Sequence, residues 1–177
     1  MRNIGVLEVC IYGDKIREIR VRVGVDGVHK SVDDDDVTRL IIDYILGLLD
    51  PQEVIKHIEL GPGLLGLAQV AMLSIPRGRV ATYAQIARLL NTSPRAVGRL
   101  ASANKLPIIV PCHRVIKSDG SVGGYSIGDV TIKSKLLEME GVPVINGRVP
   151  RSYVVDDATL MRNFKNLLRL TSESTFI

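Results

Sequence analysis

Residues 81–104 constrain the fold more than any other stretch, because they predict two short helices joined by a tight turn. Thr82, followed three residues later by Gln85, forms a capping box, which marks the start of a helix. Ser93 before Pro94 marks the start of a second helix, since proline in the first helical turn lacks only an N–H that would be unpaired anyway. Only a short turn separates the two, so we predict a helix-turn-helix.

The second helix of this unit carries an unusual set of side chains. Arg95 and Arg99 lie one turn apart, and small residues fill much of the remaining surface: Ala96, Gly98, Ala101, Ser102 and Ala103. A helix that reads the DNA major groove usually carries long polar side chains. Small residues allow close approach to the minor groove, where an arginine can enter the base stack. They could equally pack against a neighbouring helix, so this helix alone leaves both interpretations open.

Positive charge is concentrated around the same unit. No acidic residue occurs between Glu59 and Asp119, whereas the chain as a whole has a net charge of only +4. This window holds eight basic residues: Arg77, Arg79, Arg88, Arg95, Arg99, Lys105, Arg114 and Lys117. Such segregation is expected of a surface that binds a polyanion. A solvated basic face without a partner is the alternative, and we favour nucleic acid.

The N-terminal part is expected to form a hairpin followed by a helix. Residues 4–12 and the alternating residues 16–25 predict two antiparallel strands. A helical pattern covers residues 37–49. We interpret the acidic run 33–36 before it as favourable charge at a helix N-terminus rather than as a metal cluster.

The rest of the chain divides at turn signals. The Gly-Pro-Gly run 61–63 separates the N-terminal part from a buried helix over 64–73. Beyond the irregular arm 142–153, an apolar stripe predicts a docking helix in the tail: Leu160, Phe164, Leu167 and Leu168. We therefore expect an α+β protein with an N-terminal α/β domain (1–60), a mostly helical domain containing the helix-turn-helix (61–149) and a tail (150–177).

Cys112 is the strongest candidate for chemistry. It follows Pro111 at the end of the apolar run 108–110, which we interpret as a strand that presents the thiol at its end. A free thiol, with a pKa of ~8.5, is only a few per cent ionised near neutrality, so a nucleophile there needs a base. Neighbouring strand residues point to opposite faces, so His113 could serve only if the chain turns, or through a bridging water.

The other cysteine and histidines have simpler interpretations. Cys10 lies in the first predicted strand and is expected to be a buried structural thiol. His29 and His57 are expected at the surface. No Cys or His pair has zinc-like spacing, so no metal is expected. Two cysteines are too few for a disulfide framework, and no apolar window could span a membrane, which favours a reducing, cytoplasmic setting.

Six motifs between residues 62 and 145 together resemble the O6-alkylguanine-DNA alkyltransferases, also called methylated-DNA–protein-cysteine methyltransferases. They occur in the order and spacing of that family: Tyr83, Arg95-Ala-Val-Gly98, Asn104, Pro111-Cys-His-Arg-Val115, Gly123-Gly-Tyr-Ser126 and Leu136-Leu-Glu-Met-Glu-Gly141. The resemblance implies a ribonuclease H-like N-terminal domain and a winged-helix-like C-terminal domain.

The resemblance also implies a self-inactivating DNA repair reaction without a cofactor. Double-stranded DNA would be held through its minor groove by the helix-turn-helix, and the damaged guanine would be flipped into a pocket. Cys112 would then take the alkyl group irreversibly. A monomer is expected, and cooperative binding along DNA stays open.

Roles for individual residues follow from the resemblance. Cys112 would be the nucleophile, and His113, acting through a water and supported by Glu140, would take its proton. Tyr83 would donate a proton to the leaving guanine, and Arg95 would fill the vacated stack. The residues that would contact DNA are Ala84, Asn91, Arg99 and Ser118. The residues that would surround the base are Pro107, Val115, Tyr125 and Ser126. Asn104 would connect the helix-turn-helix to the cysteine, and Arg114 would form an ion pair.

Two departures from the family pattern concern packing and pocket shape. Leu64, Leu65, Ala68 and Gln69 stand where the family commonly has a Phe-Gln-x-x-Val-Trp run, and the chain has no tryptophan. After Tyr125, this chain has the bulky run 127–129 and one residue more than the family pattern before the next helix. This departure predicts restricted access for large alkyl groups.

Two other functions fit parts of the same pattern. A regulatory DNA-binding protein would recognise flipped bases without repairing them, although relatives of that kind lack the cysteine. A thiol hydrolase would use Cys112, His113 and Glu140 for repeated turnover of an ester.

Overall fold

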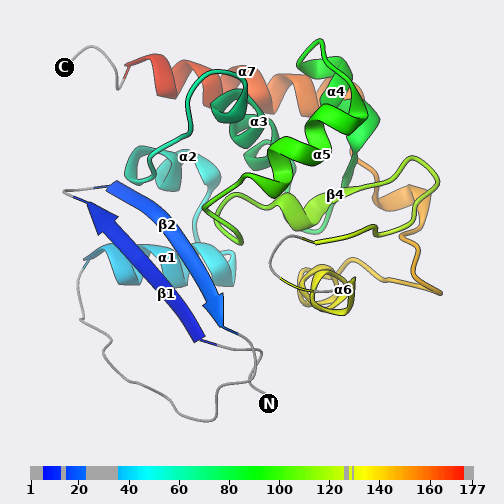
Figure 1. Ribbon diagram of the computed structural model, residues 1–177, viewed down its shortest axis with the longest axis horizontal. Helices are drawn as coiled ribbons and strands as arrows, with labels where there is room; N and C mark the ends of the chain where they lie inside the picture. Colours follow the sequence, from blue (N-terminus) through cyan, green and yellow to red (C-terminus); the bar gives the residue numbers. More distant parts are fainter. Residues whose placement is uncertain (1–5, 13–14, 23–35, 126–127, 129, 174–177) are drawn as a thin grey trace.

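The computed structural model describes residues 6–12, 15–22, 36–125, 128 and 130–173. Its elements follow in this order: β1 (Val6–Tyr12), β2 (Lys15–Arg22), α1 (Asp36–Leu46), α2 (Pro51–Val54), η1 (Ile55–His57), α3 (Leu64–Leu73), β3 (Ala81–Thr82), α4 (Tyr83–Leu89), α5 (Pro94–Ser102), η2 (Cys112–Arg114), β4 (Val115–Ile116), α6 (Val130–Met139), η3 (Arg151–Tyr153) and α7 (Asp157–Glu173). The fold is mixed α/β and mostly helical (Figure 1). None of the helices in the described part is both long and apolar enough to cross a membrane.

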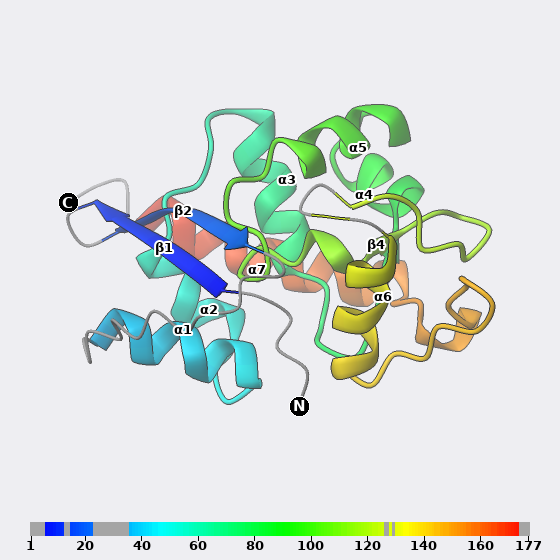
Figure 2. The same ribbon diagram turned by 60° about the horizontal axis from the view of Figure 1, so that its bottom comes forward.

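The N-terminal hairpin and helix form as predicted, with different limits. β1 pairs antiparallel with β2, and α1 lies beside this hairpin (Figures 1 and 2). The helix ends at Leu46 rather than Leu49, because Gly47 has φ 79° and leaves the helical conformation. Cys10 is partly exposed rather than buried, and His57 is half-buried. His29 and most of the acidic run 33–36 lie outside the described residues.

One apolar core extends through both the N-terminal elements and the helical part. Buried side chains of the hairpin, α1, α3, α5 and α7 belong to the same cluster. Within it α3 contacts α4, α5, α7 and the η2 turn. α3 therefore joins the helix-turn-helix to the turn that carries Cys112, and the domain limits around residue 60 stay a prediction.

The helix-turn-helix is confirmed down to its caps. In α4, the Gln85 backbone N–H donates to Thr82 Oγ1 (3.1 Å) and the Thr82 N–H donates to Gln85 Oε1 (2.8 Å). In α5, the Ala96 N–H donates to Ser93 Oγ (3.2 Å), with proline in the first turn. These bonds, which are reciprocal only in α4, satisfy N–H groups that a helix start leaves unpaired.

The predicted strand over 108–110 is wrong, because this segment forms a turn. Ile108 has φ 73°, a left-handed conformation that a β-branched residue rarely adopts. The Val110 N–H donates to the Leu106 carbonyl (2.8 Å), and the Asn104 side chain bonds both the Leu106 N–H (3.2 Å) and the Val110 carbonyl (3.3 Å). Asn104 thus stabilises a turn where the apolar composition alone favoured a strand.

The C-terminal arm and tail pack back on the molecule as predicted. Val142 and Val149 of the arm are buried in a second apolar cluster with Leu137 of α6. Leu160, Phe164 and Leu167 of α7 are buried in the main core, and Leu168 packs against it. The tail is therefore a docking helix, which Figure 2 shows running beneath α3.

Candidate active site

Cys112 and His113 are consecutive residues of the η2 turn rather than of a strand. The Cys112 N–H donates to the Val110 carbonyl (2.8 Å) and the Arg114 N–H donates to the Pro111 carbonyl (2.9 Å). A 3₁₀ turn has about three residues per turn, so adjacent side chains need not point to opposite faces as they do in a strand. The turn that His113 requires is therefore present.

On one side of this turn lies a buried ionic cluster around Glu140. Arg114 donates through Nε to Glu140 Oε2 (2.7 Å) and through Nη2 to Oε1 (2.8 Å), while His113 Nε2 lies 3.0 Å from Oε1. Burial alone would raise the pKa of Glu140, but hydrogen bonds from His113 and Arg114 outweigh it and lower the pKa to about 2. Glu140 is therefore an anion that orients His113, and Arg114 is the expected ion-pair partner.

His113 is fully enclosed and electrically neutral at rest. Its side chain is 1% exposed, and burial lowers its pKa despite the opposing pull of Glu140. Among the described residues, His113 Nδ1 has no hydrogen-bond partner. When Nε2–H donates to Glu140, Nδ1 keeps its lone pair and can accept a proton. This tautomer is the one a base for a neighbouring thiol requires.

On the other side of the turn, the sulfur of Cys112 faces polar groups without formal negative charge. Asn104 Nδ2 lies 3.7 Å from Sγ, and Asn104 Oδ1 accepts from Gln69 Nε2 (3.0 Å). Burial raises the pKa of the Cys112 thiol, against the smaller influence of Asn104, Lys133 and Tyr125. The resting thiol thus holds its proton, which makes an adjacent base necessary.

Two tyrosines border the sulfur. Burial and the nearby Cys112 both raise the pKa of Tyr83 and of Tyr125. The rings of Tyr125 and His113 meet edge to face, with centroids 6.5 Å apart. Both phenols therefore keep their protons and are available as hydrogen-bond donors.

Lys133 of α6 is a site residue that the sequence analysis missed. It is fully buried, and Nζ donates to the Val115 carbonyl (2.6 Å) and lies 3.5 Å from the Gly124 carbonyl. Nζ also lies 5.7 Å from the centre of the Tyr83 ring, and burial lowers the Lys133 pKa to about 8. Its helical spacing with Leu137 and Glu140 puts all three on one inward face, a signal that could have revealed it.

A small pocket at Cys112 adjoins a larger groove. The pocket measures about 20 Å³, which is room for about one water. It shares Tyr83, Gly98 and Gly124 with a groove of about 330 Å³ between α5 and the Lys117–Ser118 segment. Cys112 is only 3% exposed, so entry of a base requires the pocket wall to move.

Most residues assigned to DNA lie at the surface, and Ser118 lines this groove. Asn91, Arg95, Arg99 and Ser118 are exposed, and Ala84 is half-buried. Ala84 and Ser118 border a common hollow. Pro107 is instead buried in the turn before Cys112 and does not line the pocket, whereas Ser126 lies outside the described residues.

A helix-turn-helix beside a thiol, an imidazole and a carboxylate defines a DNA-binding protein with a cysteine nucleophile. Sequence comparison agrees with this class. Residues 68–142 match the family described as 6-O-methylguanine DNA methyltransferase, DNA binding domain. A methylated-DNA–protein-cysteine methyltransferase of Pyrobaculum aerophilum is 43% identical over 139 residues, covering 77% of this chain and 86% of the relative. The chain belongs to the methylated-DNA–protein-cysteine methyltransferase family.

Solved structures give the same result for the fold. The O6-methylguanine-DNA methyltransferase of Pyrococcus kodakaraensis is 28% identical, with a TM-score of 0.63, covering 77% of this chain and 98% of that one. A Mycobacterium tuberculosis OGT in complex with DNA is also 28% identical, with a TM-score of 0.62, covering 87% of this chain and 92% of that one. The expected family and its C-terminal DNA-binding domain are confirmed.

Proposed function

We propose that this protein repairs O6-alkylguanine in double-stranded DNA by transferring the alkyl group, typically methyl, to Cys112. The main support for this proposal is the turn that carries both Cys112 and His113, in which His113 Nε2 lies 3.0 Å from Glu140 Oε1. A relative 43% identical over most of the chain has the same activity in its name. Because the thiol itself is consumed, one molecule performs one reaction and needs no cofactor.

The side chains of this site can supply and accept every proton that the transfer moves. The Cys112 proton passes to His113 Nδ1, through a water, and Glu140 stabilises the imidazolium that forms. The thiolate attacks the methyl carbon in line, so that an S–C bond forms while the C–O6 bond breaks and its electron pair stays with the guanine. Tyr83 donates its phenolic proton to the guanine ring. The proton that His113 took from Cys112 finally restores the phenol of Tyr83. The products are S-methylcysteine and unmodified guanine.

DNA recognition is proposed to use the face of α5. Arg95 is exposed on this helix and would fill the gap left by the flipped guanine. Its small residues favour the minor groove, and Gly98 borders the groove that leads to Cys112. Ala84, Asn91, Arg99 and Ser118 would meet the DNA backbone.

The base itself would be held by main-chain and aromatic groups. Val115 and Ser126 would bind its edge, Tyr125 would form a wall, and Asn104 would fix the distance between α5 and Cys112. Pro107 supports this pocket only from within the preceding turn, since it does not border the cavity.

We infer that the chain acts as a monomer with three structural parts. A ribonuclease H-like region (1–60) would brace a winged-helix-like region (61–149), and the tail (150–177) would clamp α3. The antiparallel β1–β2 pair and the parallel β3–β4 pair beside α4 support this arrangement.

The test is the stoichiometry of the reaction with excess methylated duplex. We expect one repaired guanine per protein molecule and none for Cys112→Ala, which should still bind the duplex. Repeated ester turnover by Cys112 would instead indicate a hydrolase. Binding without any transfer by the wild-type protein would indicate a regulatory role. Either outcome would overturn the proposal.

A further inference from the structure

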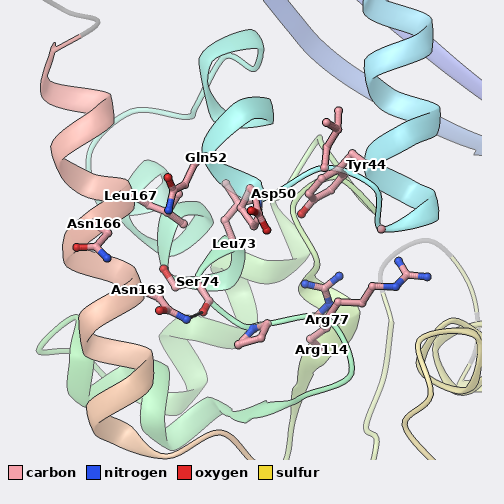
Figure 3. A pocket seen from close by; sticks show the side chains of 14 residues that line it. Tyr44, Asp50, Gln52, Leu73, Ser74, Arg77, Arg114, Asn163, Asn166 and Leu167 are labelled. Atoms are coloured by element: carbon pink, nitrogen blue, oxygen red, sulfur yellow. Dashed lines mark hydrogen bonds between the residues drawn. The ribbon is translucent and has the colours of Figure 1, made fainter.

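A second cavity, of about 280 Å³, lies outside the alkyltransfer site (Figure 3). It is bordered by the end of α1, by α2, by the end of α3 and by α7. Cys112, His113 and Tyr83 are not among its lining residues, and the reaction proposed above does not use it. Arg77 and Arg114 connect the two places, because both line this cavity and both form ion pairs with Glu140.

The hydroxyl of Tyr44 is an unpaired polar group at this cavity. Tyr44 is 6% exposed, and among the described residues its Oη has no hydrogen-bond partner. Figure 3 shows its hydroxyl directed from α1 toward Asp50 and Arg114, which border the same space. A buried hydroxyl without a partner is costly, so this donor favours an acceptor in the cavity.

The same end of the cavity carries an excess of positive charge. Arg77 and Arg114 both line it, and both lie near a single carboxylate, that of Glu140, at 3.9 Å and 2.7 Å. His113 adds no charge, because burial lowers its pKa. Asp50 brings a second carboxylate to the cavity, which balances the two guanidinium groups overall. It lies exposed at the rim, where water screens its charge, so the inner end beside Tyr44 stays positive and favours a bound anion.

The remaining walls are suited to a short apolar body. Leu73, Pro76 and Leu167 supply aliphatic surface, and amide side chains stand around the opening. Asn163 Nδ2 is engaged with the Ser74 carbonyl (3.1 Å), which leaves its oxygen as an acceptor. An apolar cavity with a few convergent polar groups is typical of small-molecule sites.

We propose that this cavity is a binding site for a small organic carboxylate. The carboxylate group would accept hydrogen bonds from Tyr44 Oη and the arginine end of the cavity. The aliphatic body would lie between Leu73, Pro76 and Leu167. Inorganic phosphate is an anion without the apolar body and therefore binds more weakly.

Amide chemical shifts of the full-length protein provide the test, with butyrate as the probe. We expect saturable, millimolar binding that shifts the signals of Gly47, Asn163 and Asn166 and spares those of α5. Butyramide has the same shape without the charge and should not bind. Tyr44→Phe should weaken butyrate binding about tenfold, since a hydrogen bond to a charged group is lost. Tyr153→Phe, a half-buried tyrosine outside the cavity, is the matched control and should bind as wild type.

Three results would overturn this assignment. They are equal binding of butyrate and butyramide to the wild-type protein, tighter binding of phosphate than of butyrate, and shifts confined to the basic surface of α5. The first comparison needs no variant, so it holds even if Tyr44→Phe does not fold. Because none of these readouts depends on methyl transfer, failure of the cavity assignment is distinguishable from failure of the proposed repair activity.

Discussion

The two sides of the η2 turn differ sharply although they begin at adjacent residues. Cys112 faces amide and phenol groups and a lysine, with Asn104 Nδ2 3.7 Å from its sulfur. His113 and Arg114 face the carboxylate of Glu140, at 3.0 Å and 2.7 Å. One side holds the reactive atom in a small pocket, and the other side is a tight ionic cluster.

This difference separates two requirements of the reaction. The sulfur must stay reachable by a flipped base, so it cannot be enclosed in strong ion pairs. The base that deprotonates it must have a fixed orientation, which the bidentate Arg114–Glu140 pair supplies through Glu140. The chain meets both requirements with a turn of three residues, and four variants test the separation.

Glu140→Gln should have the largest effect, because it breaks the ionic side. It leaves the Arg114 charge buried without a partner, which we expect to destabilise the fold by about 3–5 kcal/mol. The methyl transfer rate should fall about 100-fold or more, as when a general base loses its orientation. Denaturant unfolding and single-turnover kinetics measure these effects. Glu138→Gln, an exposed position at the end of α6 just before Glu140, should change neither, and an unchanged transfer rate in Glu140→Gln would contradict the role assigned to this cluster.

The pH dependence of stability tests the sulfur side of the turn, because Lys133 is a buried cation there. Its pKa is about 8 in the folded protein, against an ordinary lysine pKa of 10.5. At this position the unfolded chain binds more protons between these values, so Lys133 alone should raise stability by up to about 3 kcal/mol from pH 8 to pH 10.5. The raised pKa values of the Cys112 thiol and of the two site tyrosines act in the opposite direction, so the readout is the difference between variants. Over this range the unfolding free energy of the wild type and of Lys135→Met should rise relative to that of Lys133→Met, and a constant difference between wild type and Lys133→Met would exclude Lys133 as the source.

Asn104→Ala tests how far the sulfur side depends on neutral hydrogen bonds. It leaves Gln69 Nε2 and the Leu106 N–H without these bonds, and the Val110 carbonyl keeps only the bond from the Cys112 N–H, at an expected cost of about 2 kcal/mol. Because Gln69 bonds the same side chain, Gln69→Ala combined with Asn104→Ala should cost less than the sum of the two variants. Additive losses would mean that Asn104 does not connect α3 to the cysteine turn.

Thr82→Ala should have the smallest effect, because the hydroxyl that it removes bonds only Gln85. We expect a loss of about 1 kcal/mol in unfolding free energy. The reaction of Cys112 with a small soluble alkylating reagent should keep its rate. A slower thiol reaction in this variant would show that the cap, and not the turn alone, controls the sulfur.

The sequence predicted the parts of this molecule that depend on local signals. The capping box at Thr82, the Ser93 cap and the apolar stripe of α7 are each encoded within a few residues, and each forms as predicted. The turn at 106–110 was mistaken for a strand because the side chain that stabilises it, Asn104, acts through tertiary bonds that apolar composition does not reveal.

Elements of the site that depend on packing were harder to predict. Glu140 and His113 were paired correctly through the family resemblance, whereas no single motif indicated the burial of Lys133. The Tyr44 hydroxyl has no hydrogen-bond partner within the described part of the chain, which becomes evident only when α1 lies against the segment that carries Arg77 and Arg114. Such groups depend on contacts between distant parts of the chain.

Mapping the transferred methyl group tests the central claim most directly, because the protein carries its own internal control in Cys10. After reaction of the wild-type protein with duplex DNA containing O6-methylguanine, peptides are analysed by mass spectrometry. The account predicts that the Cys112 peptide alone gains the mass of one methylene, while the Cys10 peptide is unchanged and the DNA contains guanine. A methyl group on Cys10, or repaired DNA with an unmodified Cys112, would contradict it.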